Sequence, residues 1–161
     1  MPPSNNKNDT IRDLGEFGLI SHLTKNIPLY HKSSVKGIGD DSAVMDYSSG
    51  QTLATNDLLL EGIHFNLMYT PLKHLGYKAV VVNISDILAM NGLPTQIIVS
   101  IGLSTRFGLE HIDQLYEGIK LACKKYKVDL VGGDTTSSLT GMTISITALG
   151  TVDAEKVVYR D

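Results

Sequence analysis

The chain has 161 residues, of which 42% are hydrophobic and 19% are charged, and its formal net charge is −3. This length is enough for one domain with a sizeable core, and the composition is typical of a globular α/β or α+β protein. The acidic balance and the scattering of the 14 Lys and Arg residues argue against a nucleic-acid partner.

The single cysteine, Cys123, excludes a disulfide or a cysteine-based zinc site within the chain, and a buried thiol is expected. The polar first ten residues lack the apolar segment of a secretory signal. No window approaches the roughly 18 apolar residues that a membrane span requires. We therefore expect a cytoplasmic protein without a membrane partner.

Two regions are predicted: a flexible N-terminal arm over residues 1–14 and one folded domain over residues 15–161. The domain begins with a short helix from Gly15 to Asn26, whose apolar residues recur on one side. Two strands are predicted next, over residues 43–47 and 51–60. The Ser-Ser-Gly sequence between them is typical of a tight turn, so the two strands are expected to form a hairpin.

The strand over residues 51–60 carries the first candidate site residues. It ends in three consecutive leucines, which suits a strand covered on both faces. Asp57 and Glu61 bracket the leucines, and His64 follows three residues later. The alternative is an edge strand with solvated charges and a turn at Gly62.

A long helix is predicted between Thr70-Pro71, with Thr as N-cap and Pro at the first helical position, and Asn91-Gly92. The Val80-Val81-Val82 run would also suit a strand, but the caps and the length favour a helix. Asn83 and Asp86 lie one turn apart on or beside its buried face. An unsatisfied buried amide costs about 1–3 kcal/mol and a charge costs more, so both side chains are expected to have partners or ligands.

The rest of the chain alternates between strands and helices. The expected elements are a strand over residues 95–103, a helix over residues 109–126, a short strand over residues 128–131 that ends at Gly132-Gly133-Asp134, and a strand over residues 142–152. With the hairpin, this order predicts an α+β fold, in which a mixed β-sheet has helices packed on one face.

Common nucleotide and zinc motifs do not fit the sequence. Gly37-x-Gly39 lacks the third glycine of a dinucleotide fingerprint, and Gly132-Gly133 is not followed by a P-loop lysine. The five histidines have no zinc-hydrolase spacing, and there is no G-x-S-x-G sequence. Any phosphate binding must therefore rely on metal ions and backbone amides.

Five separated aspartates at strand ends or on the inner side of a helix are candidates for such a site. They are Asp40, Asp41, Asp57, Asp86 and Asp134. Mg²⁺ is held by a few carboxylates together with phosphate oxygens and water. Each aspartate alone is more typical of a turn or a cap, but together they favour a magnesium site.

Four motifs resemble, in order and spacing, the N-terminal half of the thiamine-monophosphate kinases, a family of the aminoimidazole ribonucleotide synthetase (PurM-like) superfamily. The resemblance runs from about Gly15 to Asp161. The motifs are Gly37-Ile38-Gly39-Asp40-Asp41-Ser42-Ala43; Thr55-x-Asp57 with Glu61-Gly62-x-His64-Phe65; Gly76-Tyr77-Lys78-Ala79 with Val82-Asn83-x-Ser85-Asp86-Ile87-x-Ala89-Met90; and Gly132-Gly133-Asp134-Thr135-Thr136.

This resemblance implies direct in-line transfer of the ATP γ-phosphoryl group to thiamine monophosphate, giving thiamine diphosphate, with several Mg²⁺ ions and no covalent intermediate. It also implies a homodimer whose N-terminal domains pair their sheets into a barrel. The implied metal ligands are Asp41, Thr55, Asp57, Asp86 and Asp134, the implied ATP contacts are Gly133, Asp134 and Arg160, and the implied substrate contact is His64. No catalytic nucleophile is implied.

The sequence departs from the family in two ways. Asn56 stands where the family usually has Thr or Ser, although its amide oxygen can still serve a metal or a water. Family members also carry a C-terminal domain that completes the nucleotide site. A chain that ends at Asp161 is therefore expected to be an incomplete fragment with little or no activity of its own.

Two alternatives stay open. One is another PurM-like ATP-dependent enzyme, of the selenophosphate synthetase or hydrogenase maturation type, although Glu61-Gly62-x-His64-Phe65 favours the thiamine enzyme. The other is a non-catalytic dimerisation domain whose aspartates are turn residues. That domain would show no Mg²⁺-dependent nucleotide binding.

Overall fold

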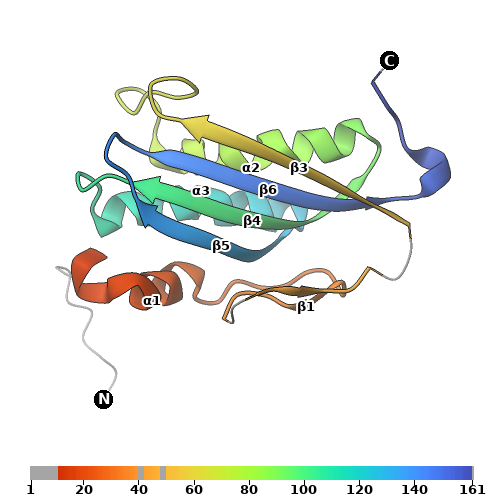
Figure 1. Ribbon diagram of the computed structural model, residues 1–161, viewed down its shortest axis with the longest axis horizontal. Helices are drawn as coiled ribbons and strands as arrows, with labels where there is room; N and C mark the ends of the chain where they lie inside the picture. Colours follow the sequence, from red (N-terminus) through yellow and green to blue (C-terminus); the bar gives the residue numbers. More distant parts are fainter. Residues whose placement is uncertain (1–10, 40–41, 48–49, 161) are drawn as a thin grey trace.

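The computed structural model describes residues 11–39, 42–47 and 50–160, and its centre is a four-stranded β-sheet (Figure 1). The strand order is β3-β6-β4-β5, with β6 antiparallel to both of its neighbours and β5 parallel to β4. The strands are β3 (Gln51–Leu60), β4 (Leu93–Leu103), β5 (Asp129–Ser137) and β6 (Thr143–Val152). The predicted mixed sheet of an α+β fold is confirmed.

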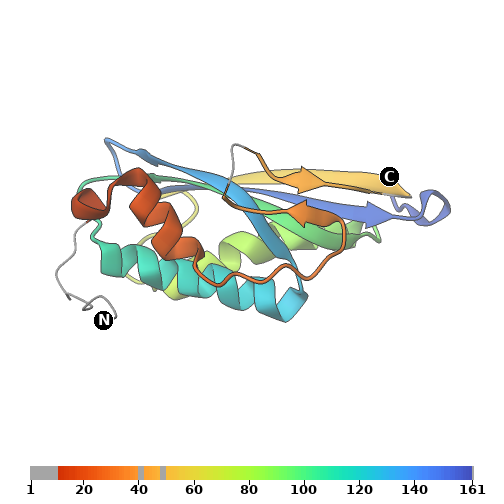
Figure 2. The same cartoon turned by 90° about the horizontal axis from the view of Figure 1, so that it is seen from below.

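Two long helices, α2 (Leu72–Ala89) and α3 (Leu109–Tyr126), lie side by side against one face of this sheet (Figure 2). Their backbones approach closely at two glycines: a Cβ on Gly76 would lie 2.0 Å from the carbonyl oxygen of Leu115, and a Cβ on Gly118 would lie 1.9 Å from that of Lys73. The core fills the space between the sheet and this helix pair. No helix in the described part of the chain is both long and apolar enough to cross a membrane.

The first helix and a small two-stranded sheet lie beside β5 (Figure 1). Helix α1 (Ile11–Thr24) begins four residues before the predicted start and contains a non-helical residue, Gly15, with φ of 64°. A separate two-stranded sheet pairs β1 (Ser34–Lys36) with β2 (Val44–Met45), and a short 3₁₀ turn, η1 (Ala154–Lys156), follows β6.

The predicted hairpin between residues 43–47 and 51–60 is wrong. Strand β3 pairs with β6 over ten residues, and β2 pairs instead with β1. A two-residue strand offers β3 few ladder hydrogen bonds, whereas β6 matches its whole length. Part of the predicted turn, residues 48–49, lies outside the described residues.

Strand β3 spans the predicted residues, but it is not covered on both faces. Leu59 is 7% exposed, because it faces the helices, whereas Leu58 is 50% exposed on the opposite face. The alternative of an edge strand is confirmed, and Gly62 makes the expected turn with φ of 83°.

Two element ends also differ from the prediction. Helix α2 begins at Leu72 with Pro71 as its N-cap, so Thr70 does not cap it. Strand β5 continues through Gly132-Gly133-Asp134 to Ser137, because its ladder with β4 extends to Leu103. The helix over residues 109–126 and the choice of helix for Val80-Val81-Val82 are confirmed.

A fully buried carboxylate, Asp129, attaches the segment before β1 to the sheet. It accepts hydrogen bonds from the backbone N–H groups of Tyr30 and His31 and, at 2.5 Å, from the hydroxyl of Ser34. Gln96 on β4 extends the network, because its amide nitrogen donates to Ser34 Oγ at 2.8 Å and its oxygen accepts from Tyr47 at 2.5 Å. These bonds satisfy a charge that burial alone would make costly.

Replacing Asp129 by Asn is expected to lower the free energy of unfolding by about 1–3 kcal/mol, because the amide has one acceptor oxygen instead of two and leaves a buried donor unpaired. Urea denaturation followed by circular dichroism measures this change. Asp46→Asn, at an exposed position after β2, is the matched control and should stay within about 0.5 kcal/mol of the parent. Equal stability of the two variants would contradict the assigned role.

Candidate functional site

One group of candidate residues lies where β3 crosses α2. Thr55 Oγ1 donates a hydrogen bond to Asp86 Oδ2 at 2.9 Å, so two implied metal ligands are in direct contact. The Asp86 side chain is exposed, which leaves its carboxylate accessible to solvent. A hydroxyl and a carboxylate are oxygen ligands of the kind that Mg²⁺ takes.

Asp57 belongs to the same face as Thr55, because alternate strand residues share a face. Asn83 on α2 is 1% exposed and fixes the strand here: its oxygen accepts from the backbone N–H of Asp57 at 3.0 Å, and its nitrogen donates to Ala79 O at 3.0 Å. The expectation that Asn83 and Asp86 have partners is confirmed.

Asn56 points to the opposite face, away from Thr55 and Asp57. Its amide nitrogen donates to Ser145 Oγ at 3.1 Å and to Thr147 Oγ1 at 2.9 Å on the neighbouring strand β6. The residue that departs from the family pattern is therefore engaged by two β6 hydroxyls.

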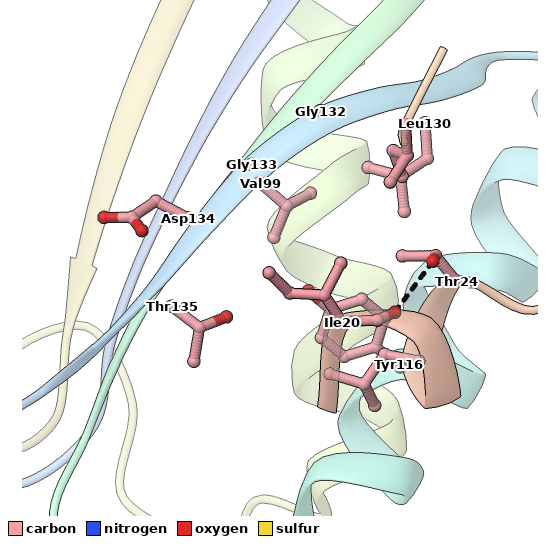
Figure 3. A pocket seen from close by; sticks show the side chains of 11 residues that line it. Ile20, Thr24, Val99, Tyr116, Leu130, Gly132, Gly133, Asp134 and Thr135 are labelled. Carbon is pink, nitrogen blue, oxygen red and sulfur yellow. Dashed lines mark hydrogen bonds between the residues drawn. The ribbon is translucent and has the colours of Figure 1, made fainter. Parts of the chain in front are cut away.

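A second group lies on β5, around Gly133 and Asp134. A cavity of about 50 Å³ is enclosed by β5, α1 and Tyr116 of α3, and Figure 3 shows Thr135 directed towards it and Asp134 directed away from it. Burial raises the pKa of Tyr116 to about 12, so its hydroxyl stays protonated at neutral pH. The cavity is far smaller than the roughly 300 Å³ of the smallest ligand pockets.

The sheet separates these two groups. Asp57, Ile146, Val99 and Gly133 lie in one row across the four strands, so Asp57 and Gly133 are three strand spacings, or about 14 Å, apart. Within the described residues, no three His, Cys, Asp or Glu side chains are grouped closely enough to hold one metal ion. Asp40 and Asp41 lie outside the described residues.

His64 is exposed and held in one orientation. Its Nδ1 accepts the backbone N–H of Leu60 at 3.0 Å, while its carbonyl oxygen accepts from Lys78 Nζ at 3.1 Å. The neutral ring therefore carries its proton on Nε2. That N–H is a hydrogen-bond donor suited to a phosphate oxygen.

Arg160 is not brought to the β5 group. Two residues earlier, the backbone N–H of Val158 bonds Met90 O at the end of α2. The Arg160 side chain is exposed, and no hydrogen bond or ion pair joins it to another residue in the described part of the chain.

Glu61 has a structural partnership that its sequence position does not reveal. Its carboxylate pairs with Arg106, in the loop before α3, and accepts the backbone N–H of Met142 at 2.9 Å. Both side chains line an open cleft of about 510 Å³ that also includes Asn66 and His111. The spacing of Glu61 and Arg106 in the sequence gives no signal for this pair.

The comparisons with known proteins agree in pointing to one family. The family of AIR synthase related proteins, by its N-terminal domain, matches residues 39–152. A thiamine-monophosphate kinase of Aquifex aeolicus is 38% identical over 151 residues, which are 94% of this chain and 46% of that protein. The chain spans about half the length of the curated relatives that it matches.

Solved structures agree with this relationship. The thiamine-monophosphate kinase of Stenotrophomonas maltophilia superposes with a TM-score of 0.72 at 26% identity, over 89% of this chain and 43% of that one. The structure of AaThiL complexed with AMPPCP and TMP superposes with a TM-score of 0.65 at 36% identity, over 97% of this chain and 47% of that one.

Gly133→Ala is expected to lower the free energy of unfolding by about 1–3 kcal/mol, because overpacking forces the backbone to move. The new Cβ would lie 2.0 Å from Val99 O, so β4 and β5 must separate beside Asp134. Urea unfolding and the amide NMR spectrum measure the two effects. The adjacent Gly132→Ala is the matched control, since its Cβ would meet nothing closer than 4.0 Å; equal effects of the two substitutions would contradict this explanation.

Proposed function

The chain belongs to the family of AIR synthase related proteins through their N-terminal domain, and we propose that it forms the ATP- and Mg²⁺-binding half of a thiamine-monophosphate kinase. The observation that carries this proposal is the 36% identity, over 97% of the chain, to AaThiL complexed with AMPPCP and TMP. AMPPCP is a non-hydrolysable analogue of ATP, and TMP is the abbreviation of thiamine monophosphate. The pair matches the two substrates of such a kinase.

The proposed reaction is transfer of the γ-phosphoryl group of ATP to a phosphate oxygen of thiamine monophosphate. The bond between the bridging oxygen and the γ-phosphorus breaks, ADP leaves, and thiamine diphosphate forms. Positioning and charge screening supply the catalysis in such in-line transfers, so no protein nucleophile is needed. This fits a site whose candidate residues are carboxylates, a hydroxyl and an imidazole.

We assign Mg²⁺ to Thr55, Asp57 and Asp86 at the β3 edge and to Asp134 on β5, with Asp41 as a further ligand. Bound Mg²⁺ would neutralise the triphosphate charge. The contact between Thr55 and Asp86 supports the first group. Because about 14 Å of sheet separates it from the second, the two groups would hold separate ions, each completed by phosphate oxygens and water.

The remaining assignments concern the ligands. His64 would donate its Nε2–H to the phosphate of thiamine monophosphate, which its fixed orientation favours. Gly133, Asp134 and Arg160 would contact ATP.

The 50 Å³ cavity beside Gly133 is too small for the base of a nucleotide, and relatives are about twice as long as this chain. We therefore propose that the 161 residues bind nucleotide weakly and transfer phosphoryl groups poorly by themselves.

We also propose that two copies of the chain pair to form a barrel. They would pair through the open sheet face, which is the face opposite α2 and α3. Within the described residues, no helix covers this face, and it carries the half-exposed Leu58 beside the hydroxyls of Ser145 and Thr147. An apolar residue at an edge strand and hydroxyls with spare bonding capacity suit a second sheet.

Isothermal titration with AMPPCP is expected to give binding only when Mg²⁺ is present. Asp57→Asn should weaken that binding by about tenfold or more, because it removes a metal-ligand charge while keeping the side-chain shape. Asp153→Asn, at an exposed carboxylate bound to Lys156, is the control. Binding that is independent of Mg²⁺, or that Asp57→Asn leaves intact, would contradict the proposed site.

Sedimentation equilibrium is expected to show a dimer that Leu58→Lys converts to monomer, because two lysines would then be buried at the interface without partners. Leu121→Lys is the matched control, since Leu121 on α3 is 48% exposed and Leu58 is 50% exposed. A monomeric parent chain, or a Leu58→Lys dimer of unchanged affinity, would contradict the proposed pairing.

A further inference from the structure

A third cavity lies on the helix side of the molecule, away from every residue assigned above. It has a volume of about 310 Å³ and is bounded by the chain after α1 and by the last turns of α3. Its apolar lining includes Ile27, Pro28, Cys123 and Leu130. This volume falls at the lower end of the range for small-molecule sites, about 300–1,000 Å³.

Two lysines of α3, Lys120 and Lys124, form the charged part of the lining. They are four residues apart and therefore lie on the same side of the helix. Neither forms an ion pair or a hydrogen bond with another residue that the structure describes. Among the described residues, a cavity with an apolar wall thus carries two cations without counter-ions.

The nearby carboxylates leave these cations unneutralised. Asp129, the residue before Leu130, is fully buried and already accepts hydrogen bonds from Tyr30, His31 and Ser34. Glu117, one turn before Lys120, is paired with Lys73 at 2.6 Å. A bound anion would therefore supply the negative charge that these two carboxylates do not provide.

Cys123 contributes an apolar surface to the cavity. It is 5% exposed, and burial raises the pKa of its thiol to about 12. The thiol therefore stays protonated at neutral pH. The cavity therefore has the properties of a reversible binding site and lacks a reactive nucleophile.

We propose that this cavity binds a small organic anion with an apolar body, of the aromatic carboxylate class. The ring would lie against Ile27, Pro28 and Leu130, and the carboxylate would lie between the amino groups of Lys120 and Lys124. Tyr30 offers a ring beside the bound aromatic group. The site contains none of the residues assigned to ATP, Mg²⁺ or thiamine monophosphate, and it goes beyond the proposed kinase function.

The probe is 2-naphthoate, titrated into the ¹⁵N-labelled chain and followed by amide NMR shifts. The amides of Ile27, Cys123 and Leu130 should move together with one dissociation constant. Two comparison ligands separate the contributions: 2-naphthamide has the same ring without the charge, and inorganic phosphate has charge without the ring. The naphthamide should bind about fivefold to tenfold more weakly, as the loss of two exposed ion pairs predicts, and phosphate should give no shifts at these amides.

The decisive variant is Lys120→Gln with Lys124→Gln, which removes both cations from the surface and leaves the apolar wall intact. It should reduce the affinity for 2-naphthoate to that for the naphthamide. Lys125→Gln is the matched control, because Lys125 lies on the same helix but faces the ring of Tyr126. Filling the cavity with Cys123→Leu should abolish binding of both aromatic ligands.

The proposal is overturned if the naphthoate shifts fall on the open sheet face, or if naphthoate and naphthamide bind equally. It is also overturned if the double lysine variant binds like the parent. If added AMPPCP reverses the amide shifts caused by 2-naphthoate, the naphthoate binds in the nucleotide site instead. Failure of AMPPCP to bind at all would contradict the kinase proposal and leave the naphthoate result unaffected.

Discussion

In the described part of the chain, helices α2 and α3 cover one face of the sheet and no helix covers the other, and this decides how the strands use their side chains. Alternate residues of a strand point to opposite faces, so Thr55 and Asp57 meet α2 while Asn56 meets the hydroxyls of β6. The close approach at Gly118 holds the two helices together as one layer. The sequence of β3 therefore serves two surfaces, one packed against α2 and one that no described helix covers.

Asp129 links this layered core to the loop that leads into the Gly37-Ile38-Gly39 motif. Its bonds to Tyr30, His31 and Ser34 fix the chain a few residues before that motif. A Cβ on Gly37 would lie 3.9 Å from Val131 Cα, so the motif begins directly against β5. Asp129 thus positions the glycines of the motif beside β5, the strand that carries Asp134. Asp129 itself belongs to neither candidate group.

Local patterns in the sequence were enough to find α3 and β3 with their observed ends, because periodicity and turn residues are local signals. Local patterns did not predict the strand pairing, because the partner of β3 is β6, which lies about ninety residues later in the chain. The motif resemblance named the candidate ligands but not their separation, which follows from the strand order. Asp129 was missed although an aspartate within the apolar run 128–131 is itself a signal of a buried, satisfied charge.

Leu130 connects two cavities that otherwise differ in chemistry. It lines the small cavity beside Gly133 and also the lysine-bearing cavity between α3 and the chain after α1. Close-packed interiors transmit displacements, because side chains have few voids into which to move. Leu130 is 4% exposed and immediately follows Asp129, whose hydrogen bonds restrain the strand there. A ligand that enters either cavity therefore meets a buried side chain that also lines the other cavity.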